Sequence, residues 1–240
     1  MERIKQLSGR AVQGILNFLK YKKHIYFPPI FFLILAGVVI GAAVFIYSQF
    51  MEEDYTPVEM EFETKSYDLS GKTIVLDPGH GGKDPGATST SNINEAQIVY
   101  NIADKLRERL EESGAEVILT REEGEFVSLD GRKQDGDLFI SLHSDAMDDP
   151  SITGFTTYYA YPNQKEFAES LNASLDEYSY FHNRGNREYG YQVIWQLDYP
   201  AALIELGYLS NRFDDHTITD PSYQDRMAEA IIEGIDNYLN

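Results

Sequence analysis

An uncharged run near the N-terminus constrains this chain of 240 residues more than any other feature. The run is IYFPPIFFLILAGVVIGAAVFIY, residues 25–47, and a helix needs about 20 apolar residues to cross a bilayer. Six basic residues and one acid precede it, and the acidic stretch MEEDY follows shortly after it. Because basic flanks stay in the cytoplasm, the pattern predicts a single-pass anchor with residues 1–24 cytoplasmic and the remainder extracellular.

Two other interpretations of the apolar run stay open. A cleaved signal peptide is one, although the run is long for that role and no clear A-x-A site follows it. Cleavage near AGVVIGAA is compatible with the sequence. A buried core helix is the other, and Pro28 and Pro29 are tolerable near the start of the helix in every case.

The charge of the chain changes at this run. The residues beyond it hold 14 of the 20 basic side chains and 38 of the 39 acids, a net charge of −24. Nucleic-acid binding requires clustered Lys and Arg, so this class of partner is excluded. Solubility in a salty or alkaline medium is a simple explanation of the acidity. The absence of cysteine excludes disulfides, thiolate metal sites and cysteine nucleophiles.

Residues 48–70 are acidic and without a clean hydrophobic period, which predicts a stalk, whereas alternating strands and helices are expected from residue 71 onward. Strands are predicted at residues 73–77, 116–120, 138–143, 154–159, 191–195 and 202–206. Helices are predicted around the apolar positions Ile98, Ile102, Leu106 and Leu110, around Phe167, Leu171, Leu175 and Tyr178, and from Pro221 to the end of the chain. This order predicts a single α/β domain over residues 71–240, with a mostly parallel central sheet flanked by helices on both faces.

Functional groups in such sheets gather at the carboxyl ends of strands. His80 follows the first predicted strand, His143 ends the third, and Glu205 lies inside the last, where an acid is costly without a partner or a task. Glu95 begins the first helix, and the intervening glycines permit the loop to fold back over the strand ends. Two imidazoles and one carboxylate form a three-ligand zinc site with an open position for water, and Glu205 is suited to carry the proton.

Each of these residues also has an ordinary structural explanation. Strand-end histidines often form loop hydrogen bonds, and an acid in a first helical turn is stabilised by the helix dipole. Glu205 is able to pair with an arginine such as Arg184 or Arg187. The other histidines fit simple roles: His24 flanks the apolar run, and His182 and His216 lie in polar loops. A nucleotide site is set aside, because the glycine cluster GHGGKDPG matches neither G-x-G-x-x-G nor a P-loop.

Taken together, the motifs resemble a known family. IVLDPGHGGKDPGA, a glutamate at a helix start, TREEGEFVSLDGR, LFISLHSDA, GFTTYY and PAALIELGYLSN are similar to the zinc-dependent N-acetylmuramoyl-L-alanine amidases of the amidase-3 type, over about residues 72–240. The resemblance implies a peptidoglycan hydrolase with one Zn²⁺ bound by His80, Glu95 and His143, and with Glu205 as the catalytic glutamate. The sequence departs from the family pattern at Asp145, where asparagine is usual, and in the loop before Glu95, which lacks the usual glycine.

Three functions follow as hypotheses. The first is cleavage of the amide between N-acetylmuramic acid and the L-alanine of the stem peptide by a membrane-anchored enzyme, with a sporulation or cortex-type role among the possibilities. The second is a zinc peptidase acting on stem peptides, and the third is an inactive, membrane-tethered wall-binding protein. The expected partners are peptidoglycan and the membrane. No long insertion resembles the helix that blocks the site in some relatives, so control by such a helix is not expected.

Overall fold

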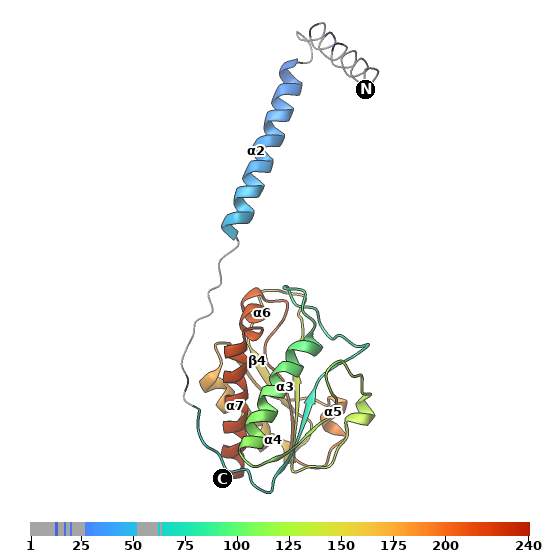
Figure 1. Ribbon diagram of the computed structural model, residues 1–240, viewed down its shortest axis with the longest axis vertical. Helices are drawn as coiled ribbons and strands as arrows, with labels where there is room; N and C mark the ends of the chain where they lie inside the picture. The colour runs from blue at the N-terminus through green and yellow to red at the C-terminus, as the bar shows by residue number, and fades with distance from the viewer. Residues whose placement is uncertain (1–12, 14–16, 18–19, 21–26, 52–61, 63) are drawn as a thin grey trace, which may run out of the picture. The chain divides into compact units, whose positions relative to one another are not determined.

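The computed structural model describes residues 13, 17, 20, 27–51, 62 and 64–240 (Figure 1). The chain divides into two compact units, residues 1–56 and 57–240, each of which is described by itself. The expected cytoplasmic segment 1–24 falls almost entirely outside the described residues, as does the central part of the expected stalk, and His24 is among these residues.

The described part of the first unit is the helix α2, Phe27–Met51. Its stretch Pro29–Ile46 is 18 residues long, is apolar enough to cross a membrane and has no residue buried within the protein. The large side chains of this stretch are exposed, which argues against the interpretation as a buried core helix. A membrane span and a signal sequence both remain compatible with it.

A sheet of six strands organises the second unit, in the order β2-β1-β3-β6-β4-β5. The strands are β1 (Thr73–Pro78), β2 (Glu116–Leu119), β3 (Leu138–His143), β4 (Phe155–Tyr159), β5 (Asn183–Glu188) and β6 (Ala201–Glu205). Strands β2, β1, β3 and β6 are parallel to one another, whereas β4 runs antiparallel to β6 and parallel to β5. The predicted α/β class with a mostly parallel sheet is therefore confirmed.

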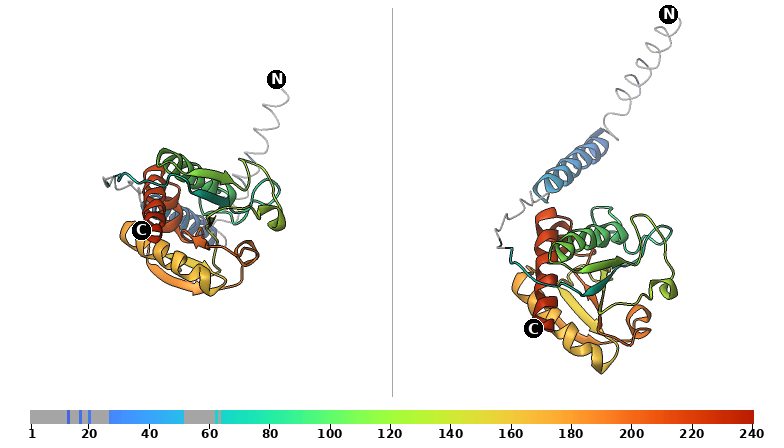
Figure 2. Two further views of the ribbon diagram at one scale, coloured as in Figure 1. Left: turned by 90° about the horizontal axis from the view of Figure 1, so that it is seen from below. Right: turned by 60° about the horizontal axis from the view of Figure 1, so that its bottom comes forward.

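The two faces of the sheet are covered unequally. The long helices α3 (Glu95–Glu112), α4 (Pro162–Tyr178) and α7 (Pro221–Leu239) pack on one face, with α7 between the other two (Figure 2). Within residues 64–240, the helix on the opposite face is the single-turn α5 (Gln192–Trp195), which packs on β3 and β6 and contacts the 3₁₀ helix η1 (Leu129–Arg132). A short helix α6 (Arg212–Ile218) precedes α7. The second face is therefore left open toward its strand ends.

Two local predictions were wrong. Residues 191–195, expected as a strand, form α5, because a helical turn lets the adjacent Val193 and Ile194 both pack on the open face of the sheet. The edge position belongs instead to β5, whose sequence NRGNRE has no apolar alternation and was not predicted as a strand. It pairs with β4 alone, and an edge strand tolerates polar and charged side chains.

The register of the central strands aligns their polar ends. Asp77 on β1 lies opposite Ser141 on β3, and His143 on β3 lies opposite Glu205 on β6. Asp77 is fully buried and accepts hydrogen bonds from Ser141 Oγ at 2.6 Å and Thr120 Oγ1 at 2.5 Å. Its ion pair with Arg132 Nη1 at 2.7 Å compensates the buried charge.

We expect Arg132→Met to lower the free energy of unfolding by about 3–5 kcal/mol, because Asp77 is left as an unpaired charge in the core. Denaturant unfolding of the metal-free protein, followed at the globular unit, measures the loss. Lys165→Met is the control, since it breaks an ion pair with Glu169 in which both side chains are about half exposed. That pair contributes about 0–1 kcal/mol, so equal losses in the two variants would contradict the prediction.

Candidate metal centre

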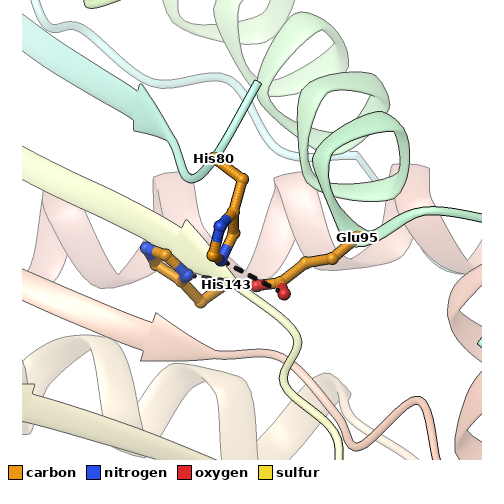
Figure 3. Close-up of side chains that lie close together, drawn as sticks. All are labelled: His80, Glu95 and His143. Atoms are coloured by element: carbon orange, nitrogen blue, oxygen red, sulfur yellow. Dashed lines mark hydrogen bonds and ion pairs between the residues drawn. The ribbon is translucent and has the colours of Figure 1, made fainter. Parts of the chain in front are cut away.

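Three side chains from separate segments meet where β1 and β3 end. His80 lies in the loop after β1, Glu95 is the first residue of α3, and His143 is the last residue of β3 (Figure 3). One ligand atom from each lies within 4.8 Å of the other two. The structure therefore brings together the three residues that the sequence singled out as metal ligands.

Glu95 is the centre of this group. Its side chain is only 1% exposed, and its two oxygens lie 3.2 Å from His80 Nε2 and 3.1 Å from His143 Nδ1. The backbone N–H groups of Ala87 and Ser144 each donate a hydrogen bond to the carboxylate. Burial acts to raise the pKa of Glu95, but the hydrogen bonds and charges of the two imidazoles hold it well below its usual range.

The conformation of His80 is unusual and is held by its neighbours. His80 has a φ of 60°, which non-glycine residues adopt only at an energetic cost. Arg132 Nη2 donates to the His80 carbonyl at 2.5 Å, and Gly81 and Asp84 exchange backbone hydrogen bonds across the turn. Asp84 Oδ2 lies 3.0 Å from His80 Nδ1, which fixes the ring so that Nε2 faces Glu95.

A second buried arginine joins the two ligand-bearing segments. The guanidinium of Arg121 donates to the carbonyls of Pro78 and Gly79 at the end of β1, at 2.7 and 3.0 Å. It also donates to the carbonyl of Ala96 in the first turn of α3, at 2.8 Å. Arg121 thereby fixes the distance between the loop of His80 and the helix start of Glu95. Neither Arg121 nor Arg132 was among the predicted site residues, although both lie in the motif TREEGEFVSLDGR.

Glu205 lies beside the cluster, opposite His143 in the register of β3 and β6. It is 7% exposed, and burial raises its pKa to about 7, against the lowering influence of His143. Its Oε2 accepts a hydrogen bond from the backbone N–H of Asp145 at 3.0 Å. Among residues 64–240 no ion pair joins Glu205 to Arg184 or Arg187, so that alternative role for Glu205 was wrong.

A pocket of about 260 Å³ opens onto the cluster. It is lined by His80, Glu95, Leu129, His143, Asp145, Tyr191, Gln192, Val193, Leu203 and Glu205. A neighbouring pocket of about 210 Å³ shares four of these residues and extends toward Phe126 and Arg132. The three ligands and Glu205 therefore face the same space, on the side of the sheet that the long helices leave uncovered.

The donor set fits a single divalent transition-metal ion. Imidazole nitrogen and carboxylate oxygen are the ligands of such ions, and three protein ligands beside an open pocket leave a coordination position for a small molecule. His182 and His216 do not belong to this group, and His182 is exposed. The geometry thus defines an α/β domain with a candidate mononuclear metal centre at its strand ends.

Comparison with known proteins gives the family. The family described as N-acetylmuramoyl-L-alanine amidase (Amidase_3) matches residues 74–237, and the chain belongs to this family. It is 41% identical over 174 residues to a probable cell wall amidase LytH of Staphylococcus epidermidis, and 40% identical to LytH of Staphylococcus aureus. These matches cover 72% of the chain and 60% of each relative.

Solved structures agree with the fold. The catalytic domain of the amidase CwlV from Bacillus (Paenibacillus) polymyxa var. colistinus is 32% identical, with a TM-score of 0.68 over 70% of this chain and 98% of that one. The amidase AmiC2 of Nostoc punctiforme is 34% identical, with a TM-score of 0.68 over 71% of this chain and 98% of that one. The CwlD amidase of Clostridioides difficile, solved in complex with the GerS lipoprotein, is 30% identical, with a TM-score of 0.64 over 70% and 98%.

Gly86→Ala is expected to weaken metal binding at least tenfold. A Cβ at Gly86 would lie 2.6 Å from Glu95 Oε2 and 2.8 Å from His80 Cδ2, so two of the three ligands must move. Gly124→Ala is a matched control, since its φ of +68° equals the +67° of Gly86 within a degree, and nothing lies within 4 Å of the added carbon. Zinc titration of both variants separates displacement of the ligands from backbone strain, and equal affinities would contradict the prediction.

Metal affinity is also expected to rise with pH. Burial opposes protonation of His80, but the hydrogen bonds and charges of Glu95 and Asp84 raise its pKa to about 9, and the pKa of His143 is raised as well. The metal-free site therefore carries protons that a metal must displace, because an imidazole ligand is neutral. The association constant for zinc should increase from pH 6 to 9, with proton release that calorimetry in different buffers detects. A constant affinity across this range would contradict the prediction.

Proposed function

We propose that this protein is a zinc-dependent hydrolase of peptidoglycan. The bond cleaved is the amide between the lactyl group of N-acetylmuramic acid and the L-alanine of the stem peptide. One observation carries the proposal: His80, Glu95 and His143 converge on a pocket that Glu205 also lines, in a chain that belongs to the amidase family.

The proposed metal ligands are His80, Glu95 and His143, and the proposed ion is Zn²⁺. Two imidazoles and one carboxylate with an open position are a common ligand set of catalytic zinc. When bound there, zinc acts as a Lewis acid toward the scissile carbonyl and lowers the pKa of water to about 7.

The proposed catalytic base is Glu205. Its pKa of about 7 lets the side chain accept a proton near neutral pH and donate it again. In the proposed reaction it removes a proton from the attacking water and then gives that proton to the alanine nitrogen as the amide bond breaks. The hydrogen bond from the Asp145 backbone N–H holds one carboxylate oxygen, so the other is directed to the reaction.

The proposed location is the outer face of a cell membrane. Support comes from the apolar stretch Pro29–Ile46 of α2, which is long enough to span a bilayer, and from the basic residues that precede it. In this arrangement residues 1–24 are cytoplasmic, residues 25–47 are the anchor, residues 48–70 are the stalk and residues 71–240 are the catalytic domain. The anchor then localises the enzyme at the wall.

Glu205→Gln should retain zinc but lose turnover by a factor of about 100 or more, because the amide keeps the shape of the side chain and removes the proton acceptor. Zinc content and amide cleavage are measured on the same preparation. His143→Ala is the comparison variant and should lose both. A Glu205→Gln variant with full activity would remove Glu205 from the mechanism.

Digestion of purified peptidoglycan by the zinc-loaded protein tests the reaction itself. A chelator should abolish cleavage, added zinc should restore it, and mass analysis should find intact stem peptides with a free L-alanine amine. New amines within the stem would instead indicate a peptidase. A protein that binds zinc and wall material without releasing any product would indicate a wall-binding role.

A further inference from the structure

Two arginines on the edge strand β5 face the same side of the sheet as the candidate site. Arg187 lies opposite Tyr158 of β4, and Tyr158 in turn lies opposite Leu203 of β6, which lines the pocket of Glu205. Arg184 stacks over the ring of Tyr208, whose hydroxyl lies 3.3 Å from Thr156 Oγ1. Because Thr156 and Tyr158 are alternate residues of one strand, both arginines are on the open face.

An irregularity of the β4–β5 ladder places both arginines there. The register changes between Phe155, which pairs with Asn183, and Thr157, which pairs with Asn186. The extra residue in β5 is accompanied by Gly185 with a φ of +95°. A bulge of this kind redirects side chains, so residues three apart point to one face of the strand.

Neither arginine has a carboxylate partner among the described ion pairs of residues 64–240. Arg187 is exposed, and its guanidinium donates a hydrogen bond to the carbonyl of Arg184 at 3.1 Å. Arg184 is half-buried, and its Nε is a buried donor without an acceptor. Its charge influences the buried Asp214, but that carboxylate already accepts hydrogen bonds from Thr153, Gly154 and Tyr208.

Both arginines lie in a segment with 38 acids and 14 basic residues. Three tyrosines connect the neighbourhood of Arg187 with the pocket: Tyr158, which lies opposite Arg187, Tyr189 and Tyr191. The ring of Tyr191, which lines the pocket, lies 5.1 Å from Tyr158 and 4.6 Å from Tyr189. A substrate that extends from the pocket across these rings therefore reaches a positively charged edge.

We propose that Arg184 and Arg187 form a subsite for a carboxylate of the stem peptide. The proposal rests on the amidase function proposed above. The glycan of peptidoglycan is neutral near the scissile bond, because its amino groups are acetylated and the lactyl carboxyl group forms the amide that is cleaved. The stem peptide, in contrast, carries free carboxylates beyond its first residue, and a guanidinium fork matches a carboxylate in shape and charge.

The test compares two synthetic N-acetylmuramyl peptides of equal length, one with free peptide carboxylates and the other with every carboxylate converted to a carboxamide. The zinc-loaded full-length protein should cleave the carboxylate form with a kcat/KM about tenfold or more higher, mainly through a lower KM. Arg187→Gln should remove most of this preference and leave the carboxamide form unaffected. The preference should also shrink as ionic strength rises, since Arg187 is exposed.

Arg107→Gln is the matched control, because it removes the same charge from helix α3, on the opposite face of the sheet, and should leave the preference unchanged. Arg187→Lys should keep part of the preference. Equal cleavage of the two peptides by the unmodified protein, or an equal loss on both in Arg187→Gln, would overturn the subsite. Arg187→Gln could instead lose activity only on whole cell walls that carry phosphate polymers and not on the synthetic peptides. That result would assign the arginines to phosphate and would overturn the peptide subsite. Failure to cleave either peptide would overturn the amidase function itself.

Discussion

The burial of one carboxylate between two imidazoles is the constraint on which the rest of this site depends. An isolated charge as buried as Glu95 is costly, and two backbone N–H groups offset only part of that cost. The remainder must come from positive charge, supplied either by protonated His80 and His143 or by a metal ion in their place. The protein therefore holds its ligands together by electrostatics in the metal-free state, and the metal and the protons compete for the same atoms.

The geometry of this cluster is set largely by groups that hold the backbone of the ligand-bearing segments. His80 adopts a left-handed backbone conformation that would be unstable in an unsupported loop. Arg132 donates hydrogen bonds both to the carbonyl of His80 and to the buried carboxylate of Asp77. Arg121 donates both to the carbonyl of Gly79, just after β1, and to the carbonyl of Ala96 at the start of α3. Each guanidinium presents several donors in a fixed plane, so one side chain satisfies carbonyls from two segments at once. The two arginines thus hold the glycine-rich loop in one conformation, which fixes the position of the candidate ligand His80.

Much of the fold and the site was predictable, for physical reasons that differ by residue. Strands such as Leu138–His143 are buried on both faces and form apolar runs, and α3 has apolar residues at helical spacing. The candidate ligands and the proposed base are polar residues at or just beyond the ends of such elements, which is why His80, Glu95, His143 and Glu205 were identifiable. The strand Asn183–Glu188 was not, because an edge strand needs no apolar pattern, and Val193 and Ile194 were misassigned because their burial depends on a tertiary contact. Arg121 and Arg132 act through backbone carbonyls, which leave no sequence pattern of their own.

The unequal covering of the sheet explains how one surface can serve both chemistry and recognition. Three long helices bury one face, whereas on the other α5 packs against β3 and β6 beside the pocket of Glu205. Along that second face, the register places His143, Glu205 and Thr156 in one row across neighbouring strands, and Leu203, Tyr158 and Arg187 in the adjacent row. The first row holds a candidate metal ligand and the proposed base, and the second leads from a residue that lines the pocket to an arginine of the edge strand. A polymer substrate lying across this face would cover both rows, from the candidate metal ligands to the arginines of the edge strand β5.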